Sequence, residues 1–170
     1  PLTDRVLGSS DLVGKLGSAT APLTNWSNEN RLHRLFMQGA LGIHRDMTLP
    51  PFAWKTFASQ FRSVHRAAHG DPVAKVAYYS TCFVNYNEPG IGLDTLEVMA
   101  RNGVDVALAY QECCGMPSLH NGEVDKVSAQ AQRNVDFLTP FVEEGRTIIA
   151  TNPTCSMMLR DEYPRLLGTQ

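Results

Sequence analysis

Short apolar runs of β-prone residues alternate with helical stretches through the second half of the chain. Helices placed between strands in this way require parallel strands joined by right-handed crossovers. The sequence therefore predicts an α/β fold with three layers, in which helices cover both faces of a parallel sheet. We expect strands at residues 73–79, 104–110 and 146–151, and helices at about 92–102, 123–144 and 155–167.

The first part of the chain lacks this alternation and is predicted to be helical and irregular. A polar stretch punctuated by glycines runs through Gly17, and apolar residues at helical spacing follow around residues 32–36. An amphipathic helix is expected from about residue 52 to 69. Gly70-Asp71-Pro72 then marks a boundary. We predict two parts, a mainly helical arm at residues 1–72 and an α/β domain at residues 73–170.

The charge of the chain excludes some classes of partner. The formal net charge is −2 and the isoelectric point is about 6.2, so the broad positive surface typical of nucleic-acid binding is absent. No apolar run is long enough to span a bilayer, and no signal segment opens the chain. The sequence begins at Pro1 without an initiator Met, and we expect it to be a piece of a longer polypeptide.

The four cysteines all follow predicted strands. Cys82 comes after the first strand, Cys113 and Cys114 after the second, and Cys155 after the third. Because the carboxyl ends of parallel strands meet at one edge of a sheet, where ligands bind, we expect all four thiols to converge.

Convergent thiolates suit soft metals, either tetrahedral zinc or an iron–sulfur cluster. The chain contains no Cys-x-x-Cys loop of the kind that zinc sites favour, which favours the larger cofactor. Cys113 and Cys114 are adjacent, and they can face one centre if Gly115 permits a tight turn. Two alternatives remain open at this point. The cysteines can be small buried apolar residues, or Cys113 and Cys114 can form a vicinal disulfide or a redox thiol pair.

Three segments resemble the CCG cysteine-rich domain family, whose members include one subunit each of heterodisulfide reductase and of anaerobic glycerol-3-phosphate dehydrogenase. These segments are Tyr79–Asn87, Glu112–Pro117 and Asn152–Pro164. The family pattern is a cysteine, then Cys-Cys-Gly, then Cys-x-x-Cys. Met158 stands where that pattern has its last cysteine. Four thiols remain, which is the number that an ordinary [4Fe–4S] cluster requires.

The resemblance implies an iron–sulfur electron-transfer subunit of a flavoprotein dehydrogenase complex. It implies that Cys82, Cys113, Cys114 and Cys155 bind the cluster, with zinc as the alternative metal. The implied partners are a flavoprotein subunit and, beyond it, a membrane anchor, a quinone or a thiol/disulfide acceptor. The implied location is cytoplasmic, either free or peripheral at the inner face of the membrane.

The arm also carries part of the resemblance. Residues 4–26 are similar to the segment that joins a ferredoxin module to the first CCG domain, and the chain lacks both that module and a second CCG domain. We therefore expect a fragment of a larger subunit. A different class of function stays open, in which the chain is a zinc-binding or metal-free interaction module.

Four polar or small residues beside the cysteines are candidates to support the bound group. They are Thr81, Asn85, Gly115 and Thr154. Hydrogen bonds from such residues tune a cluster. The same residue types are equally typical of turns and helix caps.

Overall fold

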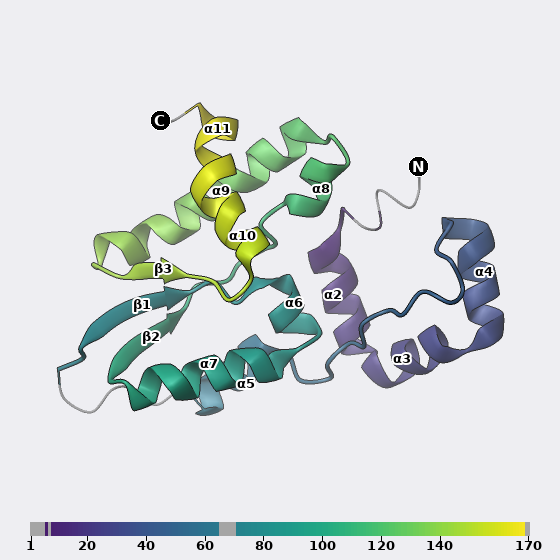
Figure 1. Ribbon diagram of the computed structural model, residues 1–170, viewed down its shortest axis with the longest axis horizontal. Coiled ribbons are helices and arrows are strands. Elements are labelled where there is room, and N and C mark those ends of the chain that lie inside the picture. The colour runs from purple at the N-terminus through teal and green to yellow at the C-terminus, as the bar shows by residue number, and fades with distance from the viewer. Residues whose placement is uncertain (1–5, 7, 65–70, 169–170) are drawn as a thin grey trace.

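The computed structural model describes residue 6 and residues 8–64 and 71–168 (Figure 1). Its elements, in chain order, are α2 (Ser10–Ala19), α3 (Ala21–Glu29), α4 (Arg31–Leu41), α5 (Phe57–Val64), β1 (Ala74–Tyr78), α6 (Thr81–Tyr86), α7 (Pro89–Arg101), β2 (Val104–Leu108), α8 (Met116–His120), α9 (Val124–Glu143), β3 (Thr147–Ile149), α10 (Pro153–Met157), the π-helix η1 (Met158–Glu162) and α11 (Tyr163–Leu167). The alternation of strands and helices after residue 72 is as predicted. In the arm, the helix expected over residues 52–69 begins at Phe57, and its expected end at residues 65–69 lies outside the described residues.

The three strands form one parallel sheet in the order β2-β1-β3. Tyr78, at the end of β1, lies opposite Leu108 of β2 and Ile149 of β3. Because β1 is central and all strands run in the same direction, the three connections that follow the strands leave the sheet at the same edge. The predicted α/β class is confirmed.

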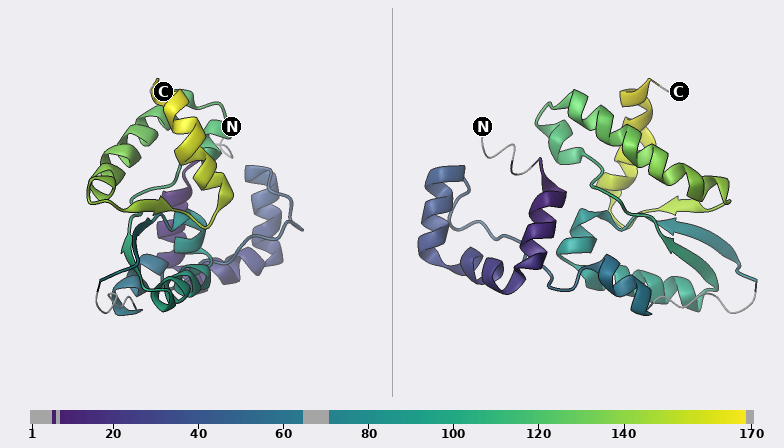
Figure 2. Two further views of the ribbon diagram at one scale, coloured as in Figure 1. Left: turned by 60° about the vertical axis from the view of Figure 1, so that its left-hand side comes forward. Right: turned by 180° about the vertical axis from the view of Figure 1, so that it is seen from behind.

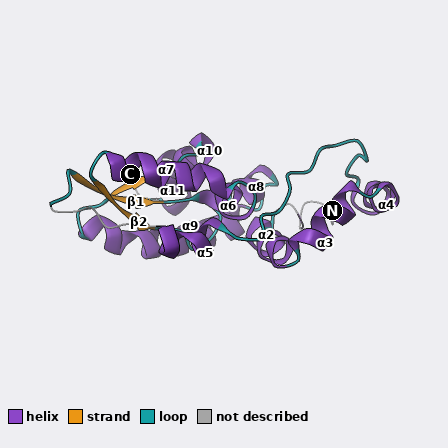
Figure 3. Cartoon of the chain, turned by 90° about the horizontal axis from the view of Figure 1, so that it is seen from below, coloured by secondary structure: helices purple, strands orange, loops and turns teal. Residues whose placement is uncertain are grey.

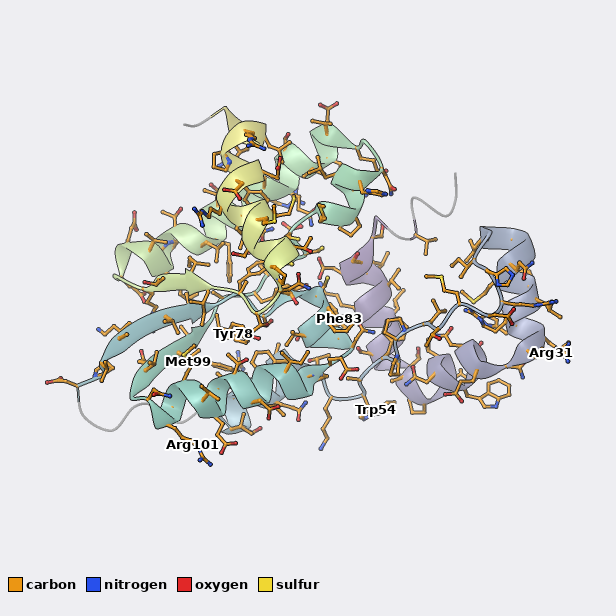
Figure 4. The ribbon with its side chains drawn as sticks, in the orientation of Figure 1. Arg31, Trp54, Tyr78, Phe83, Met99 and Arg101 are labelled. Carbon is orange, nitrogen blue, oxygen red and sulfur yellow. The ribbon has the colours of Figure 1, made fainter. Side chains whose placement is uncertain are left out.

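Helices cover both faces of the sheet, which gives the three layers that the sequence predicts (Figures 1 and 3). Residues of β1 alternate between the faces. Ala77 packs into the core under α9, α10 and α11, whereas Val76 and Tyr78 pack into the core formed by α5 and α7. Figure 4 shows Tyr78 on the side of the sheet that α7 covers. Phe57 at the start of α5 is fully buried in this second core, so a residue of the arm contributes to it.

Helices α2, α3 and α4 extend to one side of the sheet (Figure 2). Asn30 caps α4, because its side chain accepts hydrogen bonds from the first backbone N–H groups of that helix. The buried Arg34 donates hydrogen bonds to the carbonyls of His44, Arg45 and Met47, which fixes the chain after α4.

The polar stretch punctuated by glycines forms helix α2, within the part of the chain that is predicted to be helical and irregular. Gly14 and Gly17 lie on the buried face of α2. A Cβ atom on Gly14 would lie 2.3 Å from the ring of Tyr86, and one on Gly17 would lie 2.6 Å from the ring of Phe52. These glycines therefore allow close helix packing against aromatic rings, and they do not interrupt the helix.

Valine in place of Gly14 is expected to weaken the docking of α2, because its side chain would overlap the Tyr86 ring. Overpacking of this kind costs about 1–3 kcal/mol. Urea denaturation together with hydrogen exchange of the α2 amides measures the effect. Gly39→Val is the matched control, because Gly39 also lies in a helix and has no atom within 4 Å of its Cβ position. Equal effects of the two substitutions would contradict the packing role.

The segments after the strands contain more helix than predicted. Residues 81–86 form α6, where a loop is expected, and residues 116–120 form α8. The closing helix divides into α10, η1 and α11. Pro164 has no N–H for the ordinary helical bond, and the Tyr163 N–H bonds to the Met158 carbonyl five residues back. Among the described residues, no helix combines the length and apolar character needed to cross a bilayer.

Candidate metal centre

The four cysteines lie on the three connections at the carboxyl edge of the sheet. Cys82 lies in the first turn of α6, Cys113 and Cys114 lie between β2 and α8, and Cys155 lies in α10. All four thiols are free. The convergence that the strand pattern predicts is therefore observed, although two of the three connections are short helices at the cysteine position.

The sulfurs lie in two contacting pairs. Cys82 Sγ is 3.8 Å from Cys113 Sγ, and Cys114 Sγ is 3.3 Å from Cys155 Sγ. Cys113, Cys114 and Cys155 are buried, and Cys82 is half-buried. In the part of the chain that the structure describes, no three His, Cys, Asp or Glu side chains are grouped so as to hold one metal ion.

Two backbone positions with positive φ shape the cysteine turns. Gly115 has a φ of 87°, and a Cβ atom there would lie 3.2 Å from both Gln130 Oε1 and Val127 Cγ1. Thr81, directly before Cys82, has a φ of 68°. Positive φ is unusual for a β-branched residue, and such strain is concentrated at functional sites. Both turns thus have backbone shapes that present adjacent thiols to the centre.

A buried hydrogen-bond network holds the Cys-Cys-Gly turn through its backbone carbonyls. Gln130 Nε2 and Asn134 Nδ2 donate to the Cys113 carbonyl at 2.7 and 3.0 Å. The Tyr163 hydroxyl donates to the Cys114 carbonyl at 3.0 Å and accepts from Asn134 Nδ2 at 2.9 Å. Helices α9 and α11 therefore fix the two carbonyls of the turn.

Phenylalanine in place of Tyr163 removes the hydroxyl that joins Asn134 to the Cys114 carbonyl. We expect a loss of about 1–3 kcal/mol in the free energy of unfolding, because buried polar groups then lack a partner. Denaturant titration measures it. Tyr78→Phe is the control, because its hydroxyl contacts Thr151 and not the cysteine turn. The role of the network is contradicted if Tyr163→Phe costs no more than this control.

Hydrogen bonds among the thiols shift their pKa values in opposite directions. The thiols of Cys114 and Cys82 donate to Cys113, which lowers the pKa of Cys113. The same bonds, together with burial, raise the pKa values of Cys82 and Cys114. Among Cys82, Cys113 and Cys114, the thiolate form is therefore favoured at Cys113. Binding of a metal group through Cys82 and Cys114 must release their protons.

A carboxylate from the arm also reaches this centre. Tyr110 Oη donates to Asp11 Oδ1 at 2.5 Å, and the backbone N–H of Cys113 donates to Asp11 Oδ2. Burial raises the pKa of Asp11, while these two hydrogen bonds act in the opposite direction because they favour the charged form. The sequence pattern does not reveal Asp11, because about a hundred residues separate it from both donors and no local pattern marks such a contact.

The polar residues expected to support the cysteines divide into two groups. Thr81 and Gly115 shape the cysteine turns through their backbone. Asn85 instead accepts a hydrogen bond from Ala58 N–H in the first turn of α5, and Thr154 is exposed in the first turn of α10. Three residues that the sequence pattern does not single out make the contacts to the cysteine carbonyls. They are Gln130, Asn134 and Tyr163.

The donor set fits a group that is bound through soft ligands. All four candidate ligands are thiols, and they come from three separate connections. Ser80, adjacent to the Cys82 turn, is fully buried and its Oγ has no hydrogen-bond partner. An unpartnered hydroxyl at such a position is a donor available to a bound sulfur.

Residues 76–160 match the family described as CCG: Cysteine-rich domain. These residues include all four cysteines and all three strands apart from the first two residues of β1. The chain therefore belongs to the CCG cysteine-rich domain family, as its sequence resemblance indicates.

Curated relatives are similar over different parts of the chain. A subunit of the anaerobic glycerol-3-phosphate dehydrogenase of Escherichia coli K12 is 38% identical over 98% of this chain and 42% of its own length. A subunit of the fumarate reductase (CoM/CoB) of Methanothermobacter marburgensis is 28% identical over 75% of this chain and 26% of its own length. Lactate utilization protein A of Bacillus velezensis is 31% identical over 54% of this chain and 37% of its own length. The chain thus spans less than half of each relative. No solved structure gives a significant match.

Proposed function

We propose that the chain is the electron-transfer part of an oxidoreductase subunit and that its four cysteines hold an iron–sulfur cluster. The observation that carries the proposal is the meeting of four free thiols from three connections at one sheet edge, three of them buried. Cys82, Cys113, Cys114 and Cys155 are the ligands in this proposal. Four thiolates match the requirement of a [4Fe–4S] cluster.

A bound cluster supplies one-electron chemistry, and the protein supplies the binding site and its environment. The four cysteines bind the group through their sulfurs. Gln130, Asn134 and Tyr163 orient the Cys113–Cys114 turn through its carbonyls. Burial of three thiols limits the access of water, which is one of the factors that set the potential of a cluster.

The proposed complex contains a dehydrogenase or reductase partner. The names of two relatives support this part, because they are subunits of a dehydrogenase and of a reductase. In the proposal a flavoprotein subunit donates electrons, and a quinone or a thiol/disulfide compound accepts them. Large apolar side chains exposed on α3 and α4 support contact with another subunit or with a membrane anchor. They include Leu23, Trp26, Leu32 and Phe36.

The same proposal covers domain organisation and location. Residues 73–170 form the CCG domain, and residues 1–72 form an arm that leads to a ferredoxin module in the parent subunit. The proposed location is the cytoplasm, either free or at the inner face of the membrane. The match of residues 76–160 to the family supports the boundary after residue 72.

A second candidate is thiol/disulfide exchange without metal. The 3.3 Å contact between Cys114 Sγ and Cys155 Sγ favours it, because two thiols in contact can be oxidised to a disulfide. That reaction would pass two electrons and two protons to an external disulfide, which is reduced to two thiols.

Anaerobic reconstitution with ferrous iron and sulfide, followed by iron and sulfide assay and EPR of the reduced protein, tests the proposal. We expect bound iron and sulfide and an EPR signal on reduction. Stoichiometric zinc in place of iron and sulfide would support a zinc module instead. A chain without metal that forms a Cys114–Cys155 disulfide reversibly would support the second candidate.

A further inference from the structure

The arm contacts the cysteine centre through the N-terminal end of α2. Asp11 accepts hydrogen bonds from the Tyr110 hydroxyl and from the backbone N–H of Cys113. The Gly8 carbonyl accepts from Ser118 Oγ at 3.1 Å, which ties the start of the helix to α8. These contacts join residues 8–11 to the loop that carries two of the four thiols.

The Asp11 contact is separate from the packing that attaches α2 to the domain. The helix contacts the domain further along its length, where Gly14 packs on the Tyr86 ring and Ser18 Oγ donates to the Tyr86 carbonyl at 3.4 Å. The attachment of α2 to the domain therefore includes contacts that do not involve the carboxylate. The backbone N–H of Cys113 nevertheless donates to the carboxylate of Asp11. Attachment of α2 to the domain does not by itself explain this contact.

The side chain is placed to act on the Cys113 turn. Its two oxygens have different donors, so the carboxylate holds the Cys113 amide and the Tyr110 ring in one arrangement. The Tyr110 ring packs edge-on against Tyr79 with 5.5 Å between centroids, and the Tyr79 hydroxyl donates to the Glu112 carbonyl at 2.5 Å. Asp11 thus fixes Cys113 directly and also, through two rings, the residue before it.

The arm also forms one wall of a cavity beside Cys113. The cavity has a volume of about 170 Å³, and it is lined by Ser10 and Asp11 of the arm together with Cys113, Gly115 and Gln130. A cavity of this size admits water, so the arm shapes the solvent environment beside Cys113. Water access and hydrogen bonding at the sulfurs both tune clusters.

We propose that Asp11 is a positioning residue of the metal centre, which holds the Cys113 amide and lowers the reduction potential of the group bound there. This inference rests on the proposed function. Backbone N–H groups that donate to ligand or cluster sulfur stabilise the reduced state, and nearby negative charge destabilises it. Asp11 withholds the Cys113 N–H from sulfur and adds a carboxylate beside a ligand. Both effects lower the potential.

Hydrogen exchange of the Cys113 amide in the metal-free full chain tests the positioning role. Asp11→Ala is expected to speed this exchange by at least about tenfold, the factor that corresponds to the loss of one charge-assisted hydrogen bond. The control is Asp46→Ala, which removes an exposed carboxylate of the arm that pairs only with its neighbours His44 and Arg45 among the ion pairs described. Unchanged exchange in Asp11→Ala would overturn the positioning role.

Redox titration of the reconstituted full chain tests the effect on potential. Asp11→Asn keeps the shape of the side chain and removes its charge. We expect the potential to rise by about 59 mV or more, which is a tenfold change in a one-electron equilibrium. Asp46→Asn should leave it unchanged. Equal potentials in wild type and Asp11→Asn would overturn the inference while leaving the proposed function intact, whereas a wild-type chain that binds no iron and sulfide would contradict the proposed function itself.

Discussion

Cys114→Ser is expected to abolish the binding of iron and sulfide by the reconstituted chain. Serine offers a hard oxygen with a very weakly acidic hydroxyl, whereas iron–sulfur clusters require soft thiolate ligands. Loss of supporting hydrogen bonds alone costs about 10–100-fold in metal affinity, and loss of a ligand costs more. The iron and sulfide content of the anaerobically reconstituted variant measures the effect.

Cys114 contacts Cys155, and Met157, two residues after Cys155, provides a matched control. Met157→Ser replaces an exposed sulfur-containing side chain in α10 and should leave the iron and sulfide content unchanged. Circular dichroism of both variants separates loss of ligand from loss of fold. A folded Cys114→Ser variant with the full wild-type content would remove Cys114 from the ligand set.

Alanine in place of Gly115 is expected to destabilise the fold and to reduce cluster loading. Part of the loss in the free energy of unfolding comes from backbone strain, because a residue with a Cβ atom disfavours a φ of 87°. The rest comes from contact of the new Cβ atom with Gln130 and Val127 at 3.2 Å. Crowding of the Cβ atom lowers the free energy of unfolding by about 1–3 kcal/mol, in addition to the effect of the backbone strain. It also pushes against Gln130, whose amide holds the Cys113 carbonyl. Denaturant unfolding and iron content are the two measurements.

Gly122→Ala separates strain from crowding. Gly122 has a similar φ of 76° but no atom within 4 Å of its Cβ position. Its substitution should therefore show the backbone cost alone and leave the iron content unchanged. If the two alanine variants have the same stability and the same iron content, contacts around Gly115 do not shape the cysteine turn.

The convergence of the cysteines could be predicted because it depends on a regular feature. Parallel strands bring their following connections to one edge, so the position of Cys82, Cys113 and Cys155 after a strand was sufficient. The length of the strands and the short helix at Cys82 were not predictable in the same way. Residues 81–86 are too few to show helical periodicity, and Thr81 has a backbone conformation that its residue type disfavours.

The residues that support the site were harder to find because their contacts are distant in the sequence. Asn134 and Tyr163 lie on the buried faces of two helices. The sequence shows that a polar residue occurs at each position, but it does not show which group that residue contacts. Asp11 lies in a polar stretch punctuated by glycines, for which the sequence predicts no individual helix. Gly14 and Gly17 in fact permit close packing, which only the positions of the Tyr86 and Phe52 rings reveal.

Native mass spectrometry of the anaerobically reconstituted full chain tests the central claim most directly, because it reports the composition of the bound group. We predict a species whose added mass corresponds to iron together with inorganic sulfide, and the loss of that species in Cys114→Ser. A chain that keeps its metal-free mass, or that gains a single metal ion without sulfide, would contradict the claim that these four thiols hold an iron–sulfur cluster.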